Sequence, residues 1–238
     1  MAYDYLGLVN DVNRRLNEVE LTSTNFATAN GEYSMIKDAV NASIRFINQH
    51  EFEWPYNHVT EEETLTAGIV RYAFPADAKI LNMNSFRIKR NDTLGNETRK
   101  LNVLSYEEYL DSYADVEYNT STSLRQLPTY VFKAPSSEFG IVNPPDKAYE
   151  LVYEYYRLPV DLINATDVPS VPEQFRYVIV NGAMHFAYLF RGESQESAMM
   201  QARFEQEIKQ MRSLYINRYE YIRSAVLNTT VTTSARVS

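Results

Sequence analysis

The sequence predicts an α+β fold in which a small antiparallel β-unit, a sandwich or a barrel, is inserted into a helical bundle. Apolar residues recur at three- and four-residue steps near both ends of the chain, whereas they alternate with polar residues in the middle. We therefore expect the following organisation: a helical part at 1–55, the inserted β-unit at 56–158, a second helical part at 159–226 and an extended tail at 227–238.

Two helices are expected in the first helical part. The first runs from Asp4 to about Asn17, and the second from Glu32 to His50, before Pro55 ends the helical section. The apolar stripe of the first comprises Leu8, Val9, Val12 and Leu16. The buried face of the second comprises Ile36, Ala39, Val40, Ser43, Ile44 and Ile47.

The middle of the chain changes to a period of two, which is typical of strands. Strands are expected at 62–66, 69–74, 86–89, 98–104, 129–133, 139–142 and 148–157, with a hairpin loop at 91–96. In the last of these, Tyr149, Leu151, Tyr153 and Tyr155 share one face. A capping box at 105–108 predicts a short helix from Tyr106 to about Ala114.

Helices return after the Pro-flanked linker at 159–171. A second capping box, 170–173, predicts a helix to about Phe190 that buries Phe175, Val178, Ile179, Gly182, Phe186 and Leu189. After Gly192, a long helix is expected from Glu193 to Val226. Its apolar face ends in four residues expected to meet a neighbouring subunit: Tyr215, Tyr219, Ile222 and Val226.

The last twelve residues, LNTTVTTSARVS, carry no helical stripe. They fit two readings: a frayed terminus, or a β-branched strand that adds to another subunit.

Composition excludes several kinds of chemistry. The chain has no Cys and only three His, namely His50, His58 and His185, so disulfides and Cys-based metal sites are ruled out. No Gly-rich phosphate loop and no GxSxG motif occurs. We expect His185 to be a satisfied core residue, and we predict no catalytic residue, no cofactor and no metal.

Acidic groups are the remaining catalytic candidates, since a glycosidase needs only two carboxylates. The candidates are Glu61, Glu62 and Glu63; Glu107, Glu108 and Asp111; and Glu150 with Glu154. Each group has an ordinary explanation as a solvated strand or a helix N-terminal turn. The sequence therefore predicts a protein that is not an enzyme.

The net charge of −8 argues against a simple phosphate-binding surface, but an acidic wall suits DNA that slides past without sticking. No stretch has the length of a membrane span and the first residues lack a secretion signal, so we expect a soluble protein made in the cytosol, with no membrane partner. Nineteen Tyr favour a protein that works through contacts.

The order of elements, together with MIKDAVNASIRFINQHEFEWPYN, VPSVPEQFRYVIVNGAMHFAYLF and FEQEIKQMRSLY, resembles the head-to-tail adaptors of podovirus-type phages, the connector or tail-tubular-A-like proteins. The resemblance implies a virion protein of the neck that forms a ring, usually of twelve copies, between the portal protein and the tail nozzle protein. Double-stranded DNA would pass through it without sequence recognition. The tail would reach the portal through Leu227, Thr230, Val231, Thr232 and Val237.

Two rival functions remain open at this point. The β-unit could be a binding module for a glycan or a host receptor, which an exposed platform of Trp or Tyr would support. A cell-wall hydrolase ranks third and would need one of the carboxylates in a cleft.

Overall fold

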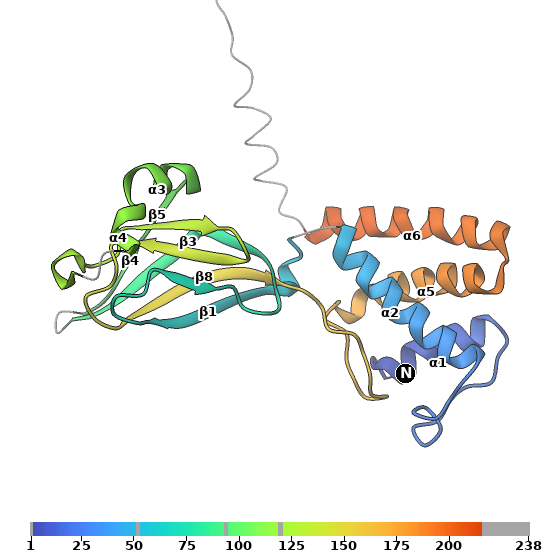
Figure 1. The fold of residues 1–238 in the computed structure, drawn as a ribbon. Coiled ribbons are helices and arrows are strands. Elements are labelled where there is room, and N and C mark those ends of the chain that lie inside the picture. Colours follow the sequence, from blue (N-terminus) through green and yellow to red (C-terminus); the bar gives the residue numbers. More distant parts are fainter. Residues whose placement is uncertain (1, 51–52, 93–94, 119–120, 216–238) are drawn as a thin grey trace, which may run out of the picture. The chain divides into compact units, whose positions relative to one another are not determined.

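A computed structural model describes residues 2–50, 53–92, 95–118 and 121–215 (Figure 1). The chain divides into two compact units. The helical unit is built from the chain up to Tyr56 and from Val160 on, and the β-unit comprises Asn57–Pro159. Each unit has its own core, and each is described below by itself.

The helical unit contains four described α-helices: α1 Tyr5–Arg15, α2 Glu32–His50, α5 Arg176–Arg191 and α6 Ser194–Tyr215. The bounds of α2 are those that the sequence predicts, and all six residues of its predicted face are buried. In α1, Leu8, Val9 and Val12 are buried and Leu16 packs at the edge of the same core. These faces form because residues three and four apart lie on one side of a helix.

The predicted capping box at Ser170 is wrong. Pro172 occupies the N-cap position in an extended conformation, and a short 3-10 turn, η3 Glu173–Phe175, leads into α5 without a side-chain cap. The Ser170 hydroxyl is buried and has no hydrogen-bond partner. The prediction that Gly192 interrupts the helix is confirmed, since Gly192 ends α5 with a left-handed φ of 79°.

The burial of Leu189 was also predicted wrongly, because its side chain is 53% exposed. The buried face of α5 runs through Val180, Ala183, Met184 and Ala187. Leu189 lies two residues beyond Ala187, which places it about 200° further around the helix. Phe186, also predicted to be buried, is only partly so.

The β-unit is a sandwich of two four-stranded sheets. Sheet A has the order β1-β8-β3-β4, and sheet B has the order β2-β7-β6-β5. The strands are β1 His58–Leu65, β2 Arg71–Ala73, β3 Ala78–Asp92, β4 Gly95–Lys100, β5 Asn102–Leu104, β6 Tyr130–Ala134, β7 Glu138–Val142 and β8 Tyr149–Arg157. One core joins the two sheets, with Phe86 and Tyr153 of sheet A packed on Phe139 of sheet B.

The predicted strand faces are largely confirmed. Leu151, Tyr153 and Tyr155 of β8 point inward and are buried, while Tyr149 is partly buried on the same face. The expectation of a wholly antiparallel unit is wrong for one pair, because β5 and β6 are parallel. The segment between them is long enough to return the chain to the same end of the sheet, which a parallel pair requires.

That connecting segment contains α3 Tyr106–Ser112 and α4 Ala114–Tyr118. Of the two hydrogen bonds of the predicted capping box, the one to the N-cap side chain is confirmed: the Ser105 hydroxyl accepts from the Glu108 N–H at 3.2 Å. The Tyr109 ring stacks on Phe132 of β6 at 3.8 Å between centroids. The helices therefore cover the outer face of sheet B.

Candidate interaction surfaces

Residues 160–168, the gold loop before α5 in Figure 1, form an irregular segment that we call the strap. The amide of Asn41 on α2 binds both backbone groups of Leu162, donating to its carbonyl and accepting from its N–H, each at 3.0 Å. Arg45, one turn further along α2, holds the Asp161 carboxylate through two hydrogen bonds of 2.7 Å. Two consecutive residues of the strap are thus fixed to α2.

The other end of the strap is fixed to the start of α1. The backbone N–H groups of Tyr5 and Leu6 donate to the carbonyls of Asp167 and Ala165, at 2.8 and 3.0 Å. The Asp167 carboxylate folds back and accepts from the N–H groups of Ile163 and Asn164, at 2.8 and 2.7 Å. These donors hold the pKa of Asp167 below its ordinary value, so the group is ionised at neutral pH.

This fixed backbone presents aliphatic side chains to solvent. Val160 is 79% exposed, Ile163 74% and Val168 63%, whereas Leu162 points into the core. Single exposed aliphatic residues are common on protein surfaces, but these three share one short segment. Hydrogen bonds to α1 and α2 fix that segment at four of its residues. Little conformational entropy remains to be lost when such a segment binds a partner.

A second surface lies where α1, α5 and α6 meet, and we call it the seam. Asn181 of α5 is its buried centre. Its amide nitrogen donates to both carboxylate oxygens of Glu207 on α6 at 2.8 Å, and its oxygen accepts from Arg15 of α1 at 2.5 Å. Arg203, one turn before Glu207, donates to the same carboxylate at 3.0 Å. The network links the three helices.

The rim of the seam carries exposed cations and apolar side chains. Arg15 and Arg203 are both exposed. Tyr177 lies one turn before Asn181 on α5, and Leu214 lies two turns after Glu207 on α6, so both follow the same edge. Leu214 is 73% exposed.

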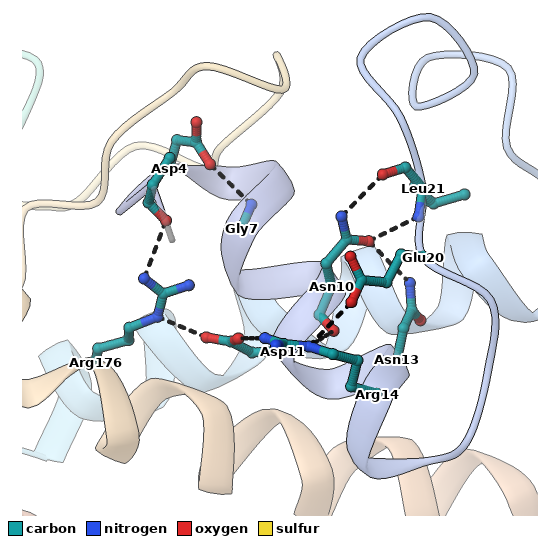
Figure 2. A network of polar contacts seen from close by, with 10 residues as sticks. Asp4, Gly7, Asn10, Asp11, Asn13, Arg14, Glu20, Leu21 and Arg176 are labelled. Carbon is teal, nitrogen blue, oxygen red and sulfur yellow. Dashed lines mark hydrogen bonds and ion pairs between the residues drawn. The ribbon is translucent and has the colours of Figure 1, made fainter.

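Polar contacts at the start of α1 hold the helix in place (Figure 2). The Asp4 carboxylate caps α1 by accepting from the Gly7 N–H at 2.8 Å. Arg176 of α5 donates to the Asp11 carboxylate at 2.5 Å and to the Ala2 carbonyl at 3.0 Å. The α1 helix, which contacts both the strap and the seam, is therefore fixed to α5.

Tyr215 is the only described member of the predicted inter-subunit face. Its ring packs on Phe175 at 5.3 Å and on Tyr56 at 6.3 Å, both in its own chain. The hydroxyl accepts from the Gln174 amide at 3.4 Å. Two sets of predicted residues lie outside the described part of the chain: Tyr219, Ile222 and Val226 of the helix face, and Leu227, Thr230, Val231, Thr232 and Val237 of the tail.

The paired carboxylates are spread over separate surfaces. Glu62 bridges to Lys89 at 2.5 Å on the outer face of sheet A, and Glu154 faces His58 at 3.4 Å. Glu61 and Glu63 point inward at the edge strand β1, where burial raises the pKa of Glu63 and a hydrogen bond from the Tyr153 hydroxyl offsets part of that rise. Glu107, Glu108, Asp111 and Glu150 are exposed.

The three histidines also occupy separate places. His185 is partly buried, and its Nδ1 lies 3.0 Å from both the carbonyl and the hydroxyl oxygen of Ser197. His50 is exposed at the end of α2. Among the described residues, no three His, Asp or Glu side chains are grouped so that they could hold a metal ion.

Trp54 forms no exposed platform for a glycan. Its side chain is fully buried, its indole N–H donates to the Ile47 carbonyl at 2.9 Å, and its ring stacks on Tyr56. Within the described ranges, no helix has the length and apolar character needed to cross a membrane.

Comparison with known families defines the class of this protein as a phage head-to-tail adaptor. The chain belongs to the SU10 adaptor protein family, whose family model matches residues 3–230. A comparison with curated proteins gave no match. The family makes the chain a structural component of a virion, and the resemblance read from the sequence is confirmed.

Proposed function

We propose that copies of this chain form a ring, of twelve subunits by the resemblance, that joins the portal protein to the tail nozzle and lines part of the channel for double-stranded DNA. The match to an adaptor family over residues 3–230 is the observation that carries the proposal, because it includes both units of the chain. The protein would act through geometry and not through catalysis. A net charge of −8 fits a channel wall past which DNA slides.

In this proposal, the tail residues contact the portal and the helix face meets the neighbouring copy. The tail residues are Leu227, Thr230, Val231, Thr232 and Val237. Tyr219, Ile222 and Val226, which follow Tyr215 on the same predicted face, would make the contact with the next copy. Each subunit would also present one surface to the copy before it and a different surface to the copy after it, as a closed ring requires.

Native mass spectrometry of the chain, alone and with its portal ring, tests the proposal. We expect a monomer alone and a stoichiometric ring on the portal. Deletion of Leu227–Ser238 should leave the urea midpoint unchanged and reduce portal binding by at least tenfold. A truncated chain that still forms the full ring on the portal would exclude the role of the tail, and an intact chain that ignores the portal would exclude the adaptor role.

A further inference from the structure

We infer that the strap of one copy binds the seam of the next copy, so that the two surfaces form the contact between neighbouring helical units. The inference rests on the proposed ring and names the partner of each surface. Three features support it: the location of the two surfaces, their charges and their exposed side chains.

The strap and the polar centre of the seam contact opposite ends of α1, whereas Tyr177 on the rim of the seam follows Arg176, which donates to the Ala2 carbonyl before the start of α1. The strap is bound at Tyr5 and Leu6, and the seam is built around Arg15, about 15 Å further along the helix. In Figure 1, α6 runs above α5, and the strap lies below the start of α5. Two different surfaces on one subunit can join a series of copies head to tail, whereas a twofold contact would use a single surface twice.

The charges of the two surfaces are complementary. The strap contains Asp161 and Asp167 and no Lys or Arg, and Asp38 of α2 is close enough to raise the pKa of Arg45. Arg45 brings one positive charge to these three carboxylates, so the surface keeps a net negative charge. The rim of the seam carries Arg15 and Arg203, and the single acid between them, Glu207, is buried. Opposite charges steer association and fix its register.

The apolar groups are complementary as well. Val160, Ile163 and Val168 on the strap would cover Tyr177 and Leu214 on the seam, and each surface would remove aliphatic area of the other from water. Both surfaces are rigid before they meet, because hydrogen bonds fix the strap and the Asn181 network fixes the seam. Association then orders few side chains.

Thiol cross-linking tests the contact without interference, because the chain has no Cys. The double variant Ile163→Cys with Leu214→Cys should give a ladder of covalent oligomers when assembled on the portal and treated with a short bismaleimide, which alkylates one thiol at each end. The control is Ile163→Cys with Met199→Cys. Met199 is on the same helix and 69% exposed, but lies about 22 Å from Leu214. We expect at least tenfold less ladder from the control.

The outcomes separate this inference from the proposed function. A ring on the portal together with the Ile163–Leu214 ladder supports both. A ring without the ladder, or with an equal ladder from the control, overturns the strap–seam contact and leaves the adaptor role standing. A ladder in the free protein with no ring on the portal supports the contact and overturns the adaptor role. Neither ring nor ladder overturns both.

Discussion

Replacing the Asn41 side chain tests whether its two hydrogen bonds to Leu162 hold the strap against α2. Replacing it, Asn41→Ala, leaves the N–H and the carbonyl of Leu162 buried without their partner. Each buried polar group left without a partner costs about 1–3 kcal/mol. Because the neighbours of Leu162 are exposed, water can reach these groups in part and reduce the cost. We therefore expect the free energy of unfolding to fall by about 2–4 kcal/mol.

Trp54 allows this loss to be measured for the helical unit alone. It is the single Trp of the chain and is fully buried in the core of that unit. With a urea m-value of about 2 kcal/mol per M, the midpoint followed by Trp fluorescence should fall by about 1–2 M. Hydrogen exchange of the peptide containing Leu162 should accelerate in parallel.

Asn164→Ala is the matched control, because Asn164 is an exposed strap residue whose amide binds only the Asp167 carboxylate, at 3.3 and 3.5 Å. Its midpoint should change by less than about 0.3 M, in line with the small effect of exposed polar substitutions. An Asn41→Ala shift no larger than that of the control would refute the view that Asn41 fixes the strap.

Two further predictions concern carboxylates. Asp167→Asn removes an acceptor whose folded pKa lies below its ordinary value of 3.8, so the stabilisation is present above that value and lost as the pH falls through the folded pKa. The urea midpoints of the wild type and variant should differ at pH 7 and converge as the pH falls through the folded pKa of Asp167, and a constant difference would contradict this. The double variant Glu61→Val with Glu63→Val removes two inward charges from the open edge of sheet A, and light scattering should show faster aggregation than for Glu62→Val, whose side chain lies on the outer face. Equal rates would show that the inward charges do not protect the edge.

Elements with strong local patterns could be predicted from the sequence. The α2 helix and the inward face of β8 follow from periods of 3.6 and 2 that burial on one side imposes. The Ser105 cap was predictable because its hydrogen bond is local, whereas the similar pattern at Ser170 failed because Pro172 adopts an extended conformation there. The two sequence patterns are similar, and only the backbone conformation shows that the first caps a helix and the second does not.

The strap could not be predicted, because its conformation depends on residues far away in the sequence. Asn41 and Leu162 are 121 positions apart, and the segment from Pro159 to Val171 has no periodicity, so it was interpreted as a linker. The one local signal was the pairing of Asn164 with Asp167, a spacing at which Asn and Asp often close turns.

The predicted helix face and the seam use different sides of α6. Tyr215 continues the buried side of Phe204, Ile208 and Met211, and the structure places its ring on Phe175 of the same chain. Leu214 is one residue earlier and therefore about 100° away, on the exposed edge beside Arg203 and Glu207. A heptad pattern identifies a buried side but does not say whether the same chain or another covers it. For the described part of α6, the same chain covers it, and the edge at Leu214 is the one left for a neighbour.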